Sequence, residues 1–279
     1  IPKISSDSIG RMVDGIGEEL AKEGYQLLLA STNNNEREEV RYLQTFRNNY
    51  VDGVILIGTI FRKEHRKALE ELEVPVVILG QQYEGYACVY QDDCHSARDV
   101  AELLTKSCRH IAYIGVTRED KAAGAAREDG FRKGLQEAGI TFDDHRYRRE
   151  SEFTMSGGYE AVVDLLSEEN GIDIISCATD TIAAGAIEAL VAQSKKAVPE
   201  SVQNSGARML HILEQSGICV TGFGDNQMLR AVTGGIPTVH FGYKTSGIKG
   251  AELLLEQIEE KNLVPVHMKL GFQIVNRFE

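Results

Sequence analysis

The sequence lacks the features of a membrane protein and of a protein that holds nucleic acid by charge. None of its apolar runs approaches the roughly 18–20 residues that a membrane helix needs. Its formal net charge is −12, from 42 acidic and 30 basic residues, whereas surfaces that bind phosphate backbones are basic. We therefore expect no membrane partner, and no DNA contact made by these 279 residues alone.

Motifs of several enzyme classes are also absent from the sequence. There is no G-x-G-x-x-G after a predicted strand, no G-x-x-x-x-G-K-[ST] and no G-x-S-x-G, so no nucleotide fingerprint and no nucleophile elbow. The seven histidines are scattered without the spacing of metal ligands. We predict that the protein is not an enzyme and that it carries no cofactor and no catalytic or bound metal.

Cysteine usage indicates a reducing compartment. The five cysteines are an odd number and contain no C-x-x-C pair. Three of them, Cys88, Cys177 and Cys219, lie in apolar runs, where a free cysteine behaves as a small hydrophobic residue. We expect a cytoplasmic protein. The chain begins at Ile1 without a methionine, so we expect a processed or trimmed chain.

Apolar runs alternate with amphipathic segments along the whole sequence. The runs read as buried strands at residues 25–30, 51–58, 74–79, 87–90, 110–116, 172–177, 218–223, 238–241 and 273–275. Helical spacing predicts helices at residues 5–22, 36–48, 62–72, 94–106, 122–137, 156–166, 181–193 and 245–260. Continuous apolar strands between helices are typical of parallel sheets covered on both faces. Two serial arrays of similar length predict an α/β protein with two doubly wound lobes.

One charged residue of the predicted helix 122–135 falls on its apolar face. Ala123, Arg127, Phe131 and Leu135 are spaced four apart, so they share one side of a helix. This spacing points Arg127 into the domain, just beyond the end of a strand. Because an unpaired buried charge is strongly unfavourable, a carboxylate, a carbonyl or a ligand must satisfy its guanidinium.

Polar residues follow most of the predicted strands. Ligands of open parallel sheets bind at the carboxyl ends of the strands. Acids, amides and hydroxyls with one arginine suit sugar hydroxyls, which both donate and accept hydrogen bonds. The aromatic residues Phe61, Phe153 and Tyr243 could stack on the apolar face of a pyranose. The polar residues are Ser5–Ser8, Thr59, Gln81, Gln82, Gln91, Asp92, Asp93, Thr179, Asp180, Asp225 and Asn226.

A structural interpretation of the same residues competes with the functional one. Asp7, Asp93 and Asp180 each lie at the start of a predicted helix or just before it, and an aspartate there caps the helix more often than it binds a ligand. Phe153 and Tyr243 would be core aromatics in most proteins. The functional interpretation rests on the coincidence of several such groups at equivalent strand ends.

The order of motifs resembles the effector-binding core of LacI/GalR-type bacterial transcription repressors, which share their fold with periplasmic sugar-binding proteins. The matching segments are residues 2–6, 51–56, 92–93, 110–115, Arg127 with 130–131, 179–187 and 222–226. Residues 153–159 and 240–247 look most similar to regulators of sucrose and related disaccharide operons.

The resemblance implies two Rossmann-like lobes of the type I periplasmic-binding-protein fold, joined by three crossovers near Cys108, Thr238 and Leu270. Residues 1–107 and 240–269 would form the N-terminal lobe, and residues 108–239 and 270–279 the C-terminal lobe. The resemblance also implies that the protein is a homodimer that represses transcription. The headpiece that binds operator DNA, and the first strand of the first lobe, would precede residue 1.

The resemblance assigns roles to individual residues. Arg127 would be the arginine that clamps the sugar between the lobes, and the sugar would control DNA binding allosterically. The other ligand-binding positions would be Ser6, Ile9, Phe61, Asp93, Phe153, Thr179, Asp180, Asp225 and Tyr243.

Two departures from the family pattern affect this assignment. Gly224 replaces the aspartate that many members have there, and Asp225 follows one place later. Asp225, Asp180 or the ligand is therefore expected to pair with Arg127. Residues 201–217 are an insertion with a predicted helix of unknown purpose.

The alternative function is that of a periplasmic sugar-binding protein of an ABC transporter, which has the same two lobes.

Overall fold

The chain divides into two units, and each contains its own parallel sheet. A computed structural model describes residues 1–48, 51–106, 108–193, 216–260 and 263–277. Unit 1 comprises residues 1–92 and 241–271, and unit 2 comprises residues 93–240 and 272–279. The chain thus passes between the units three times, after residues 92, 240 and 271, and we expected three crossovers near Cys108, Thr238 and Leu270. Helix α4 belongs to unit 2, although we expected residues up to 107 in the first lobe.

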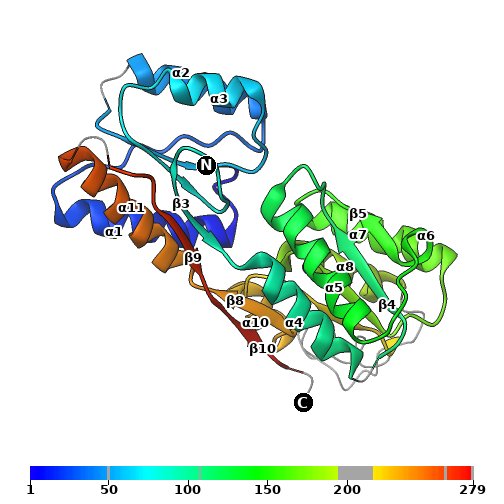
Figure 1. Cartoon of the computed structure of the whole chain (residues 1–279). Helices are drawn as coiled ribbons and strands as arrows, with labels where there is room; N and C mark the ends of the chain where they lie inside the picture. The colour runs from blue at the N-terminus through cyan, green and yellow to red at the C-terminus, as the bar shows by residue number, and fades with distance from the viewer. Residues whose placement is uncertain (49–50, 107, 194–215, 261–262, 278–279) are drawn as a thin grey trace. The chain divides into compact units, whose positions relative to one another are not determined.

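Unit 1 is a four-stranded sheet with the order β1-β2-β3-β9 and helices on both faces (Figure 1). All three strand pairs are parallel. Helix α11 packs on one face of the sheet and against α1, and the pair α2 and α3 lies over the other face. The elements are α1 (Asp7–Lys22), α2 (Glu36–Asn48), β1 (Val54–Ile57), α3 (Lys63–Glu70), β2 (Val76–Leu79), β3 (Ala87–Gln91), α11 (Tyr243–Glu259) and β9 (His267–Leu270).

The strands of unit 1 form because they are apolar on both faces. All four residues of β2 are buried, and successive side chains point to opposite faces. Ile78 belongs to the core under α2 and α3, whereas Leu79 contacts α11 at Gly250. A strand that both helix layers cover needs this continuous apolar run.

Unit 2 contains a second parallel sheet, with the order β5-β4-β6-β7. Helices α7 and α8 pack together, as do α4 and α5. Strands β8 and β10 pair separately. The elements are α4 (Asp93–Thr105), β4 (Ile111–Gly115), the π-helix η1 (Lys121–Ala126), α5 (Arg127–Glu137), α6 (Asp144–Tyr147), β5 (Arg148–Glu150), α7 (Met155–Glu168), β6 (Ile174–Cys177), α8 (Asp180–Gln193), β7 (Cys219–Thr221), α10 (Gln227–Thr233), β8 (Thr238–Phe241) and β10 (Phe272–Val275).

Two glycines let α4 and α5 approach closely. A Cβ atom at Gly130 would lie 2.0 Å from the carbonyl oxygen of Cys94. One at Gly134 would lie 2.5 Å from the carbonyl oxygen of Arg98. Both distances are far below van der Waals contact, so any side chain at either position would separate the helices.

Most predicted elements are confirmed, but some predictions differ from the structure, and β5, α6 and α10 were not predicted. Residues 25–30 form no strand, because they have no ladder partner among the described residues over that length. The predicted helix 122–137 begins as the wider turn η1 and becomes α-helical only at Arg127. Strand β9 was not predicted, although its four residues alternate between exposed and half-buried positions, as in a strand with one face toward solvent. The helix predicted within residues 201–217 lies almost wholly outside the described residues.

Candidate functional site

Arg127 is held in a buried ion pair with Asp93. The Nε atom of Arg127 donates to Oδ1 of Asp93 at 2.8 Å. Its Nη1 atom donates to the carbonyl oxygen of Ala178 at 2.6 Å, directly after β6. The two residues are only 7% and 5% exposed. Charge-assisted hydrogen bonds of this kind satisfy a guanidinium that would otherwise be very costly to bury.

An aromatic ring completes the surroundings of the guanidinium. Its central carbon lies 4.8 Å from the centroid of the Phe223 ring, which follows β7. A cation over an aromatic face is attracted by the ring quadrupole. Arg127 therefore joins the ends of β6 and β7 to the N-terminus of α4.

The π-helix η1 places Arg127 at the start of α5. Asp120 caps η1, and its Oδ1 atom accepts hydrogen bonds from the backbone N–H groups of Ala122 and Ala123, both at 2.9 Å. Burial raises the pKa of Asp120 above its ordinary value, although these hydrogen bonds and Arg127 act in the opposite direction. π-Helical turns are frequent at functional sites. We had not assigned Asp120 a role, although an aspartate before the helical run was visible in the sequence.

A second buried carboxylate, that of Asp180, accepts hydrogen bonds from two other segments of unit 2. Its Oδ2 atom accepts from the backbone N–H of Asn226 at 2.6 Å, and its Oδ1 atom accepts from the hydroxyl of Thr238 at 2.8 Å. Burial raises the pKa of Asp180, while these two hydrogen bonds lower it. Gly222 is required here, because a Cβ atom would lie 2.2 Å from Oδ1 of Asp180.

Asp225 forms a separate cluster with two basic residues. Its Oδ1 atom accepts from Nη2 of Arg277 at 2.9 Å, and its Oδ2 atom lies 3.1 Å from Nδ1 of His240. Burial alone would raise the pKa of Asp225, but the hydrogen bonds from Arg277 and His240 outweigh it and hold the pKa below its ordinary value. Its φ of 50° lies in the left-handed region, which aspartate tolerates better than most residues. Arg277 was not among the predicted site residues.

The acidic partner of Arg127 is therefore neither of the two that we expected. Asp180 and Asp225 hold other donors, and Asp93 supplies the carboxylate. Because Asp93 heads α4 and α4 packs on α5, the pair forms inside unit 2. Two predicted residues of unit 2 remain. Thr179 caps α8 by accepting from the Ile182 N–H, and Phe153 is half-buried before α7.

Four predicted site residues belong to unit 1. Ser6 precedes α1, and its hydroxyl lies 3.0 Å from that of Ser8. Ile9 is half-buried in α1. Phe61 stacks on Tyr83 with ring centroids 4.3 Å apart. Tyr243 is buried at the start of α11 with the Arg11 guanidinium 5.0 Å from its ring centroid.

The described residues contain neither a metal-binding cluster nor a membrane-spanning helix. In the ranges that the structure covers, no group of three or more histidine, cysteine, aspartate or glutamate residues could hold a metal ion. Within the same ranges, no helix has the length and apolarity to cross a membrane.

Comparisons with known proteins agree on one family. Residues 9–262 match the family described as periplasmic binding proteins and sugar binding domain of LacI family. The chain is 26% identical to the sucrose operon repressor of Staphylococcus xylosus, over 94% of this chain and 75% of the relative. It is 25% identical to the ribose operon repressor of Escherichia coli (strain K12), over 93% of this chain and 74% of that protein.

Among solved structures, the complex of the transcriptional regulator CelR with cellobiose superimposes with a TM-score of 0.82. It is 24% identical, and the match covers 98% of this chain and 79% of that one. These similarities confirm the predicted fold class, two α/β lobes of the type I periplasmic-binding-protein kind. The relatives are transcription repressors and not enzymes, as predicted, and they do not favour the transporter alternative. The chain belongs to the family of periplasmic binding proteins and sugar-binding domains of the LacI family.

Proposed function

We propose that this chain is the effector-binding and dimerisation core of a cytoplasmic transcription repressor whose effector is a small sugar, with a disaccharide such as sucrose as the first candidate. The Arg127–Asp93 pair at the strand ends of unit 2 is the observation that carries the proposal. A planar guanidinium and a carboxylate side by side offer donors and acceptors to neighbouring sugar hydroxyls.

The side chains at the strand ends of unit 2 favour a neutral ligand over a negatively charged one. Asp93, Asp120 and Asp180 lie at or near the strand ends with Arg127, so acidic groups outnumber the cation. A phosphorylated ligand would meet a surplus of negative charge there, whereas hydroxyls pair with carboxylates. The similarity to the sucrose operon repressor supports a disaccharide in particular.

The regulatory part of the proposal follows from linkage. A sugar that binds one arrangement of the two units better than another shifts the population toward that arrangement. In the proposed homodimer this shift would change how an N-terminal headpiece meets operator DNA.

Calorimetry on the purified chain tests the proposal. Sucrose, trehalose, maltose, cellobiose, ribose and free hexoses are titrated separately, with fructose 1-phosphate as the charged comparison. We expect a disaccharide to bind and the phosphorylated sugar to bind more weakly. Absence of heat and of a thermal shift with every sugar would refute the sugar proposal. Sedimentation analysis tests the dimer independently.

A further inference from the structure

Unit 1 buries two polar side chains that each have an atom without a hydrogen-bond partner among the residues that the structure describes. These atoms are Nε2 of Gln91, the last residue of β3, and Oγ of Ser246, in the first turn of α11. Gln91 is 5% exposed and Ser246 is 0% exposed. An unpaired amide or hydroxyl is costly to bury, so each of these two groups needs an explanation.

The side chain of Gln91 lies on the face of the sheet that α11 covers. Successive side chains of a strand point to opposite faces. Cys88 is part of the core under α2 and α3, and Tyr90 packs against that core. Gln91 follows Tyr90 and therefore lies on the other face, where α11 contacts β3.

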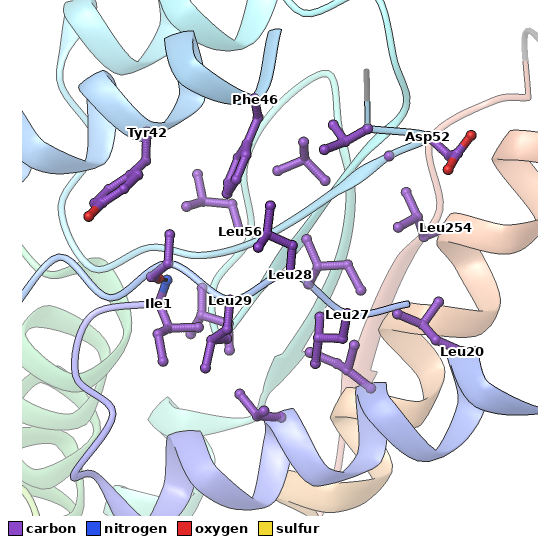
Figure 2. A pocket seen from close by; sticks show the side chains of 18 of the residues that line it. Ile1, Leu20, Leu27, Leu28, Leu29, Tyr42, Phe46, Asp52, Leu56 and Leu254 are labelled. Carbon is purple, nitrogen blue, oxygen red and sulfur yellow. Dashed lines mark hydrogen bonds between the residues drawn. The ribbon is translucent and has the colours of Figure 1, made fainter. Parts of the chain in front are cut away.

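Helix α11 runs against the direction of the strands and crosses them obliquely. Leu254 lies against Gly53, which directly precedes β1, since a Cβ atom at Gly53 would lie 2.8 Å from Cδ1 of Leu254. Figure 2 shows Leu254 beside the segment that carries Asp52. One turn closer to the start of α11, Gly250 lies against Leu79, the last residue of β2. Toward its own N-terminus, α11 therefore passes from the amino end of β1 to the carboxyl end of β2.

Ser246 lies one further turn along this path, level with Gln91. Residues four apart share one face of a helix, so Ser246 faces the sheet as Gly250 does. Four residues rise about 6 Å, which takes Ser246 past the end of β2 toward β3. Gln91 lies two residues beyond Val89, the partner of Leu79, which is about 7 Å along the strand. The two unpaired groups thus lie on the same face and at the same level, at the carboxyl ends of the strands.

A neutral hydroxyl group is the occupant that suits this pair. An alcohol O–H both donates and accepts, so it can pair with the Gln91 amide in either orientation and with the Ser246 hydroxyl at the same time. An anionic group is disfavoured, because Asp92 and Asp93 directly follow Gln91 in the chain.

We propose that Gln91 and Ser246 bind one hydroxyl group of the sugar effector and thereby select among sugars. This inference rests on the proposed function. The pair lies at the carboxyl ends of parallel strands, where ligands of such sheets bind. Neither residue is among the ligand-binding positions that we predicted from the sequence. Buried polar groups that a ligand hydroxyl pairs with discriminate strongly against analogues that lack it.

Calorimetry on two variants of the whole chain tests the inference. The variants are Ser246→Ala, which removes only the hydroxyl, and Gln91→Met, which keeps the length of the side chain. The probe is whichever of sucrose, trehalose, maltose and cellobiose binds the wild-type chain most tightly. We expect each variant to bind it about tenfold more weakly. The double variant should lose less than the product of the two single losses, because both residues serve one hydroxyl.

The melting temperature without sugar provides a matched control. Gln91→Met and Ser246→Ala should leave it unchanged or raise it, because each removes an unpaired buried group. Gln81 is buried to the same extent, but its Nε2 atom donates to the carbonyl oxygens of Gly58 at 2.7 Å and Thr59 at 2.8 Å. Gln81→Met should therefore lower the melting temperature by about 2–4 °C.

Monodeoxy derivatives of the same disaccharide identify the hydroxyl. The wild-type chain should bind one derivative about tenfold more weakly than the parent sugar. For that derivative alone, the wild-type chain and the Ser246→Ala and Gln91→Met variants should have equal affinity, because the interaction is already absent.

The outcomes separate this inference from the proposed function. If the wild-type chain binds a sugar and both folded variants bind it equally well, the inference is overturned and the proposed function stands. Unchanged affinity together with a lower melting temperature in both variants would assign the pair to a structural water instead. Absence of sugar binding by the wild-type chain would overturn the proposed function and this inference together.

Discussion

The Nε atom of Arg127 and the Oδ1 atom of Asp93 lie 2.8 Å apart, although the residues are 34 positions apart in sequence. The pair joins the first residue of α5 to the first residue of α4. Both helices belong to unit 2, so the ion pair is a property of that unit alone.

Removing Asp93 should destabilise the protein strongly. Asp93→Ala leaves the Arg127 guanidinium buried without its carboxylate, which costs about 3–5 kcal/mol in comparable pairs. Urea unfolding measures the loss. The control is Asp99→Ala, because Asp99 pairs with Arg98 at about one-third exposure and should cost less than about 1 kcal/mol. Equal losses in both variants would show that the Asp93 pair contributes nothing beyond a surface ion pair.

Removing Arg127 should weaken sugar binding. Arg127→Ala eliminates a buried charged donor, and the proposed function then predicts a loss of at least about 2 kcal/mol, or about 30-fold in Kd. Calorimetry with the sugar that binds the wild-type chain measures it, and circular dichroism verifies folding. A folded variant with unchanged affinity contradicts the role of Arg127.

Gly222 should not tolerate a methyl group. Gly222→Ala places a Cβ atom against Asp180 and should cost about 2 kcal/mol, as overpacking usually does. Gly10→Ala is the matched control, because Gly10 is the fourth residue of α1 and its Cβ would meet no atom within 4 Å. That control should stabilise the protein by about 0.5–1 kcal/mol. Thermal unfolding of both variants gives the comparison.

The Asp225 cluster should contribute stability that acid removes. Its pKa is depressed in the folded state, so the contribution is present above the ordinary aspartate pKa of 3.8 and is lost as pH falls through the folded-state pKa. Arg277→Ala should therefore lower the melting temperature more at pH 7 than at about pH 2. A difference that stays constant with pH would assign the effect to the hydrogen bond from Arg277 to the Ile236 carbonyl instead.

Local patterns predicted much of the fold, and the exceptions have physical causes. Buried strands such as β2 are continuous apolar runs, and their identity follows from composition. Strand β9 alternates exposed His267 and Lys269 with half-buried Met268 and Leu270, a strand pattern that four residues carry only weakly, and its pairing with β3 stabilises it. Residues 25–30 have the composition of a strand, but a strand forms only where a neighbour completes its ladder.

The candidate site was predictable only in part. Helical spacing correctly placed Arg127 on the buried face with Phe131 and Leu135. Its partner could not be deduced, because the choice among Asp93, Asp180 and Asp225 depends on how distant segments pack. Nor does spacing reveal the π-helix η1, whose sequence K-A-A-G-A-A suits an ordinary helix equally well.

The close packing of α4 and α5 has a mechanical consequence for Arg127. Gly130 and Gly134 leave no space between the two backbones, and the Arg127–Asp93 pair ties their N-terminal ends. Two helices joined in this way resist sliding past each other and should move as one rigid body. A displacement of Arg127 should therefore also move Thr105, which lies at the far end of α4, about 18 Å along the helix axis from Asp93.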